Sequence, residues 1–411
     1  MNNAHLKKYA NLLVRAGGNV QKGQLVVIYS DVSDADFARM VMDCAYDAGA
    51  SDVAIIWSCD ICSRTKYLRA ADSVFDTFPQ WMVDRYKYFD DKNAVYLSII
   101  SSDPDLYAGV DTNRLMRFAK ASKSATKDHM NLLMKSELRW SVCALPSPAW
   151  AKKVFPDMPE SEALDLLMGF ILKAARADGS DPIAEWEEHQ ANFVKRLDYL
   201  NKQQFSSLHI TTGLGTDLTV GLVKNHRWTG GSSIDKDGLP FFSNIPTEEV
   251  FTMPDCNLAD GVVVASMPLS YQGNLIEDFK IEFKNGRITD YQANKNREIL
   301  TNIIEMDEGA SHLGEVAIVA NSSPISQMSV LFYNTLFDEN ASSHLALGKA
   351  YPKNIEGGNS MTAEELTVAG ANDSLVHVDF MFGTTDMRIA GINQDGSETV
   401  FFDNGEFIEF V

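Results

Sequence analysis

Short apolar runs alternate with helical stretches through the first half of the chain. Four runs are rich in β-branched and aromatic residues, the pattern of strands buried on both faces, at 25–29, 53–57, 94–100 and 140–145. Helical stretches are expected between and after them, at about 35–48, 80–90, 113–138, 159–177 and 181–203. Strands that alternate with helices predict an α/β domain with a mostly parallel sheet.

From about residue 205 the pattern changes to short strands and turns. Strands are expected at 207–211, 217–222, 262–266 and 279–283. Asn285-Gly286 and Asn404-Gly405 each predict a hairpin, because type I′ turns need positive φ at both central positions. We therefore expect two domains: 1–203, an α/β domain that ends in a helical bridge, and 204–411, an α+β domain rich in antiparallel strands.

Composition narrows the classes of partner. The 411 residues carry a formal net charge of −20, which repels phosphate backbones and disfavours nucleic acid. No run of about 18 apolar residues and no basic amphipathic face occurs, so no membrane association is expected. The five cysteines are an odd, scattered set, typical of free thiols in a reducing compartment, and the N-terminus lacks a signal-peptide core. These features predict a cytoplasmic protein.

Candidate chemistry begins at HVDFMFG, 377–383. The apolar flanks predict a strand, so His377 and Asp379 point to the same face. A histidine and an aspartate on an apolar strand are costly to bury without a partner. They form either a hydrogen-bonded pair in the core or part of a ligand set.

Three further segments carry similar side chains. In NIPTEEVFT (244–252), Glu248 and Glu249 would face opposite ways on a strand, so at least one carboxylate faces inward. Glu315 opens the apolar run 313–320, as a ligand or as an exposed first residue of a strand. His344 follows polar residues that favour a helix start, and a helix to Pro352 would place His344 and Tyr351 on one face. Each of these signals is weak alone.

Together these segments supply three carboxylates and two imidazoles within the second domain. Oxygen and imidazole ligands suit zinc, cobalt or manganese. Two divalent ions bring four positive charges, which three carboxylates and one bridging hydroxide balance. Two ions are therefore favoured over one, and such a pair activates water near neutral pH.

The four ordered segments NIPTEEVFT, LGEVA, DENASSHLALGKAY and HVDFMFG resemble the metal-binding blocks of the thermophilic-type aminopeptidases, the aminopeptidase T, aminopeptidase S and PepS family. The resemblance spans the whole chain. It implies two divalent ions (zinc, cobalt, manganese or magnesium), and metal ligands at Glu249, Glu315, His344, His377 and Asp379. It further implies an active-site tyrosine at Tyr351, and a homodimer whose sites open into an internal cavity.

On this basis the chain is expected to be a metalloaminopeptidase that acts on short peptides with a free N-terminus. Tyr351 would donate to the oxyanion, and Glu248 or a ligand glutamate would carry the proton to the leaving amine. Two alternatives stay open: another dinuclear hydrolase, such as an amidohydrolase or phosphoesterase, and a binding protein whose metals only brace the fold.

Overall fold

The computed structural model describes residues 3–101, 103–271 and 273–408, which form two compact units. One unit comprises Met1–Glu188 with Ser232–Pro246, and the other His189–Gly231 with Thr247–Val411. The division falls inside helix α9 (Pro182–Gln203), whereas the expected domain boundary lies at the end of that helix. The first unit also includes the short segment Ser232–Pro246 from the second half of the sequence.

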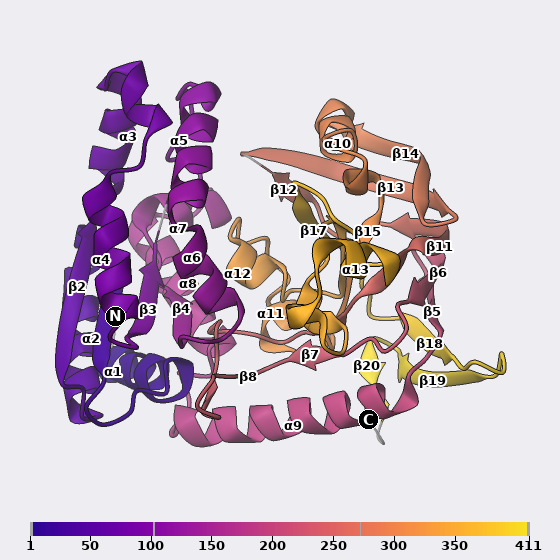
Figure 1. Ribbon diagram of the computed structural model, residues 1–411, viewed down its shortest axis with the longest axis horizontal. Coiled ribbons are helices and arrows are strands. Elements are labelled where there is room, and N and C mark those ends of the chain that lie inside the picture. Colours follow the sequence, from indigo (N-terminus) through magenta and orange to yellow (C-terminus); the bar gives the residue numbers. More distant parts are fainter. Residues whose placement is uncertain (1–2, 102, 272, 409–411) are drawn as a thin grey trace. The chain divides into compact units, whose positions relative to one another are not determined.

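The first unit is built on a parallel sheet of β1 (Leu25–Asp31), β2 (Asp52–Ser58), β3 (Val95–Ile100) and β4 (Trp140–Ala144). The strand order is β2-β1-β3-β4, and all three neighbouring pairs are parallel, which confirms the predicted α/β architecture (Figure 1). The helices are α1 (Asn3–Leu12), α2 (Ala35–Asp47), α3 (Asp60–Arg69), α4 (Gln80–Asp90), α5 (Thr112–Ala125), α6 (Lys127–Met134), α7 (Pro148–Val154) and α8 (Glu160–Ala174). The helix expected over 113–138 is thus two helices, broken at Thr126.

The second unit contains a nine-stranded sheet and a five-stranded sheet, as predicted for an antiparallel domain. The larger has the order β12-β13-β11-β6-β5-β18-β19-β20, with β14 beside β13. Its strands are β5 (Ser207–Thr211), β6 (Asp217–Leu222), β11 (Pro254–Val264), β12 (Leu269–Tyr271), β13 (Asn274–Lys284), β14 (Arg287–Lys295), β18 (Arg388–Ile392), β19 (Glu398–Asp403) and β20 (Glu406–Phe407). The short helices are α10 (Arg297–Ile304), α11 (Pro324–Met328), α12 (Thr335–Asp338) and α13 (Ala363–Val368).

Both predicted hairpins are confirmed in this sheet. Asn285 and Gly286 have φ of 49° and 80° and join β13 to β14. Asn404 and Gly405 have φ of 51° and 73° and join β19 to β20. Positive φ at both central positions matches the right-handed twist of the flanking strands.

The five-stranded sheet has the order β17-β16-β15-β10-β7, with every neighbouring pair antiparallel. Its strands are β7 (Thr229–Gly230), β10 (Val250–Thr252), β15 (Leu313–Ile318), β16 (His344–Gly348) and β17 (His377–Met381). Alternate residues of these strands enter the hydrophobic core of the unit, namely Val250, Val316, Ile318, Leu345, Leu347, Val378 and Phe380. The residues between them face the other side of the sheet, where the polar side chains gather.

Among the described residues, no helix combines the length and apolarity that crossing a bilayer requires. All five cysteines are free thiols, as expected.

Candidate metal centre

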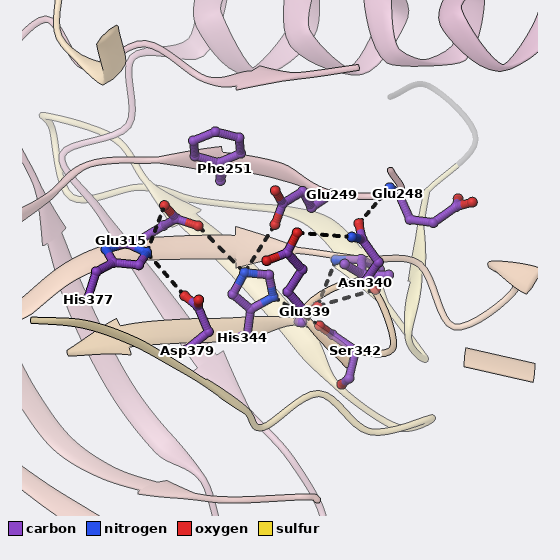
Figure 2. Close-up of polar contacts among 12 residues, drawn as sticks. Glu248, Glu249, Phe251, Glu315, Glu339, Asn340, Ser342, His344, His377 and Asp379 are labelled. Carbon is purple, nitrogen blue, oxygen red and sulfur yellow. Dashed lines mark hydrogen bonds and ion pairs between the residues drawn. The ribbon is translucent and has the colours of Figure 1, made fainter. Parts of the chain in front are cut away.

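Two-residue periodicity places all five predicted ligand residues on one face of the five-stranded sheet. Across the sheet, Glu315 on β15 and Asp379 on β17 both pair with Ala346 on β16, the strand between them. His344 lies two residues before Ala346, and His377 lies two residues before Asp379. Glu249 directly precedes strand β10, between β15 and β7. Figure 2 shows the five side chains pointing toward one another.

Small residues in β16 make room for this arrangement. Ala346 separates the two carboxylates that flank it, and Gly348 pairs with His377. Both are fully or nearly fully buried on the face that carries the five predicted ligand side chains. A larger side chain at Ala346 would occupy the space between Glu315 and Asp379, so the sheet register and the small residue together determine how closely the ligands approach.

The ligand atoms fall into two groups that share one residue. Glu249, Glu315 and His344 form the first, and Glu315, His377 and Asp379 the second, with the atoms of each group within 4.8 Å of one another. The His344 Nε2 atom lies 3.1 Å from Glu249 Oε2 and 3.5 Å from Glu315 Oε1.

In the second group, His377 Nε2 lies 3.3 Å from Asp379 Oδ1 and 3.8 Å from the other oxygen of Glu315, Oε2. The two carboxylate oxygens of Glu315 therefore face different imidazoles.

The hydrogen bonds of both imidazoles leave the Nε2 atoms available as ligands. The Nδ1 atom of His377 lies 2.6 Å from the Lys349 carbonyl, and that of His344 lies 3.2 Å from the Ser342 carbonyl. A carbonyl only accepts, so Nδ1 carries a proton in each ring, and Nε2 is the nitrogen that can bind a metal ion in exchange for its own proton. This is the usual outer-shell arrangement of metal-binding histidines.

Four atoms of the cluster are buried and, within the described part of the chain, have ion-pair contacts but no hydrogen bond of good geometry: Glu249 Oε2, Glu315 Oε2, His344 Nε2 and Asp379 Oδ1. Buried polar atoms are normally paired, and buried charges are paired or bind metal ions. All four point into the cluster, so the donor set fits divalent cations held between the carboxylates and imidazoles.

Electrostatics support the same conclusion. Burial lowers the pKa of His344, but the carboxylates of Glu249 and Glu315 outweigh it and hold that pKa well above its usual value. Burial also lowers the pKa of His377, but the Asp379 carboxylate outweighs this effect and raises that pKa to about 9. Burial, with the neighbouring carboxylates, raises the pKa of Glu315. The cluster by itself thus attracts positive charge, which protons or metal ions supply.

The expected helix around His344 is wrong. His344 begins strand β16, where Leu345 and Leu347 enter the core and His344 and Ala346 face the cluster. Tyr351 nevertheless reaches the site, because the chain turns after β16. The ring of Tyr351 lies 4.7 Å from that of His377, and its pKa is raised by burial and by the nearby carboxylates, so the hydroxyl stays protonated at neutral pH.

Glu248 and Glu249 do face opposite ways, as their adjacent positions predict. Glu249 points into the cluster, whereas the Glu248 carboxylate is turned away from it and lies 3.8 Å from His189 Nε2 (Figure 2). Glu248 is buried, and its backbone N–H donates to Asn340. The predicted proton shuttle is thus near the site without facing the ligand atoms.

Sequence reasoning missed two ionisable residues beside the cluster, Glu339 and Lys353. Glu339 points toward it in Figure 2, and burial together with the carboxylates of Glu249 and Asp379 raises its pKa well above the usual value. The Lys353 ammonium lies 4.7 Å from the centre of the Phe251 ring, and burial lowers its pKa. Glu339 lies five residues before His344, and Lys353 lies two residues after Tyr351. This closeness in sequence to predicted site residues could have pointed to both.

Comparison with known proteins agrees with this geometry. A family model described as thermophilic metalloprotease (M29) matches residues 2–407. The chain belongs to this family. Aminopeptidase AmpS of Bacillus subtilis is 44% identical over 402 residues, covering 98% of each chain. Aminopeptidase PepS of Streptococcus thermophilus is also 44% identical, with 98% of each chain covered. The solved structure of AmpT from Thermus thermophilus superimposes with a TM-score of 0.92 at 36% identity, covering 99% of both chains.

Membership in the M29 family makes the chain a metal-dependent peptidase. The match covers both units, so the sheet with the ligand cluster and the N-terminal parallel sheet are both part of the family's architecture.

Proposed function

We propose that the chain is an aminopeptidase that removes the N-terminal residue from short peptides at a pair of divalent ions. The main support for this proposal is the position of Glu315, whose two carboxylate oxygens face different histidines and so belong to separate groups of ligand atoms. A carboxylate shared in this way suits two neighbouring ions, with Glu249 and His344 completing one and His377 and Asp379 the other.

When bound, such a pair of ions supplies a water of lowered pKa and polarises the scissile carbonyl. The chain's own residues do the rest. Tyr351 keeps its proton and stands beside His377, where its hydroxyl donates to the oxygen that becomes negative during attack. This contact is strongest in the transition state, so it lowers the barrier rather than only tightening binding.

Glu339 favours an amine-bearing substrate over a phosphoester. The three ligand carboxylates already balance the ions and the nucleophile that they activate. Burial and the neighbouring carboxylates raise the pKa of Glu339 in the metal-free cluster, but two bound cations would lower it again, so beside the loaded site Glu339 would ionise and add a further negative charge. That charge attracts a peptide's α-ammonium and repels a phosphate. We assign Glu339 to holding the α-ammonium of the substrate.

Transfer of a proton to the leaving amine falls to a ligand glutamate or to Glu248, the shuttle that the sequence predicts. The Glu248 side chain would have to turn toward the cluster to reach the amine. Measuring kcat of Glu248→Gln tests its share directly: a fall of about 100-fold would assign it the role, and an unchanged kcat would give it to a ligand glutamate.

Activity on amino-acid anilides tests the function as a whole. The metal-loaded protein should hydrolyse anilides with a free α-amine and leave their N-acetyl counterparts and phenyl phosphate untouched. A chelator should abolish activity, and zinc, cobalt, manganese or magnesium added singly should restore it. Phosphatase activity without anilide hydrolysis would support the rival hydrolase. Melting on chelation with no activity before it would support a metal-braced binding protein.

We also propose that the chain forms a homodimer and is located in the cytoplasm. Sedimentation of the purified chain should give twice the 45.6 kDa of one chain. A monomer at micromolar concentration would contradict the dimer.

A further inference from the structure

A pocket of about 310 Å³ opens beside the cluster, entirely within the second unit. One wall carries His377 and Asp379 from β17, and Glu339 lines it as well. Its volume is at the lower end of the range for small-molecule sites, which suits one amino-acid side chain rather than a long peptide.

From this pocket we infer that the peptidase has a subsite for a large apolar side chain at the N-terminal residue of its substrate. This inference rests on the proposed function. In an N-terminal residue, the Cα atom is bonded to both the α-amine and the scissile carbonyl carbon. A pocket that adjoins the proposed ammonium-binding Glu339 and the proposed ligands His377 and Asp379 is therefore where its side chain lies.

The lining determines which side chain fits. Apart from the charged residues, most of the lining is apolar or aromatic, with Leu269, Tyr271, Leu331, Tyr333 and Met381, and the polar residues Ser270, Asn334 and Thr335 complete it. Such a surface favours leucine or phenylalanine, whose burial releases water from apolar area.

The remaining acidic group in the lining is engaged by the backbone. The Asp338 carboxylate accepts hydrogen bonds from the backbone N–H groups of Phe332, at 2.7 Å, and Asn334, at 2.9 Å. Asp338 is 6% exposed, and its burial raises its pKa to about 7. A carboxyl group used in this way is a poor counter-ion for lysine or arginine, so the pocket does not favour a basic side chain.

The same carboxyl group holds an aromatic wall in place. Tyr333, between the two donors, has φ of 56°, the left-handed region that bulky residues rarely adopt. Such strain persists where the surroundings fix the backbone, and it concentrates at ligand-binding segments. Asp338 is thus a positioning residue that keeps Tyr333 at the pocket.

Kinetics on a panel of anilides tests the subsite. The wild-type, metal-loaded protein should give kcat/KM for leucine and phenylalanine anilides at least about 10-fold above that for alanine anilide, since one methylene in an apolar pocket is worth about 10–200-fold. Lysine anilide should fall below leucine anilide. Equal values across the panel, or lysine anilide as the best substrate, would overturn the inference while leaving the aminopeptidase proposal intact.

Filling the pocket is the second arm of the experiment. Leu331 is only partly buried, so Leu331→Trp should fold and should lower kcat/KM for phenylalanine anilide at least about 10-fold more than for alanine anilide. Leu214→Trp, at a position 55% exposed and outside the lining, is the matched control and should behave as wild type. Leu331→Ala, which cannot overpack the site, should also reduce the preference for leucine over alanine.

A binding measurement separates the subsite from catalysis. The amino alcohols L-phenylalaninol and L-alaninol carry the α-amine and the side chain but no cleavable bond. Calorimetry should give the wild type a preference for L-phenylalaninol of at least about 10-fold, and Leu331→Trp should lose it. An unchanged preference in folded Leu331→Trp would overturn the subsite. Absence of anilide hydrolysis by the wild type would instead count against the proposed function.

Discussion

Replacing Glu315 by glutamine should remove more metal than replacing any residue that belongs to a single group of ligands. Glu315 serves both groups, whereas Glu249 serves only the first and Asp379 only the second. The glutamine side chain keeps the size of glutamate, so the fold is expected to survive. The change removes one of two carboxylates from each ion at once.

The size of the effect follows from this division. Loss of an outer-shell partner already weakens metal affinity by about 10–100-fold, so loss of a ligand carboxylate should weaken it by about 100-fold or more. With free metal at about ten times the wild-type Kd, the wild type should hold about 1.8 ions per chain. Glu249→Gln and Asp379→Asn should hold about 1.0, and Glu315→Gln about 0.2.

Elemental analysis after equilibrium dialysis gives these ratios directly. Glu248→Gln is the matched control, because it changes a neighbouring buried carboxylate that is turned away from the cluster and should keep the wild-type content. If Glu315→Gln bound as much metal as Glu249→Gln, Glu315 would not be shared and the two-ion assignment would fail.

Four other changes test separate parts of the structure. Tyr351→Phe should lower kcat by about 100-fold or more with normal metal content, and unchanged kcat in steady-state assays would remove Tyr351 from the mechanism. Ala346→Leu should abolish metal uptake while the circular dichroism spectrum is retained, because the leucine side chain would fill the space between the Glu315 and Asp379 carboxylates. Normal metal uptake would contradict the strand pairing that places Ala346 between them. Leu347→Ala, on the opposite face, should cost about 2–5 kcal/mol in urea unfolding but leave the metal content unchanged, and metal loss would show that the two faces are coupled. Burial raises the pKa of Asp338 to about 7, so the protonated carboxyl group favours the folded state. The free energy of unfolding of the metal-free wild type, measured relative to Asp338→Asn, should therefore fall by on the order of 4 kcal/mol between about pH 4 and pH 7. A difference that does not change with pH would contradict the raised pKa.

Period-two alternation explains why part of the site was predictable. His377 and Asp379 stand two apart in an apolar segment, and that local pattern sufficed to predict a strand and a shared face. Both Asn-Gly hairpins were also predictable from local sequence, because the positive φ that a type I′ turn requires depends on the turn residues themselves.

His344 shows where local signals conflict. The polar residues before it and Pro352 after it suggested a helix, yet Leu345 and Leu347 alternate into the core as in a strand. Burial of that alternating pair decided the outcome, because tertiary packing outweighs weak capping preferences.

Other features depend on contacts distant in sequence. Ala346 matters because register sets it between Glu315 and Asp379, and no local pattern reveals that pairing. The pocket likewise joins β12, the segment 331–339 and β17, which lie far apart along the chain. The resemblance to the aminopeptidase family supplied the ligand set as a whole.

Anomalous diffraction from crystals grown with zinc, recorded at the zinc edge, tests the paired-ion site most directly. Two peaks about 3.5–4 Å apart are predicted on either side of the Glu315 carboxylate, one beside His344 and Glu249 and the other beside His377 and Asp379. A single peak, or two peaks without Glu315 between them, would contradict a dinuclear centre.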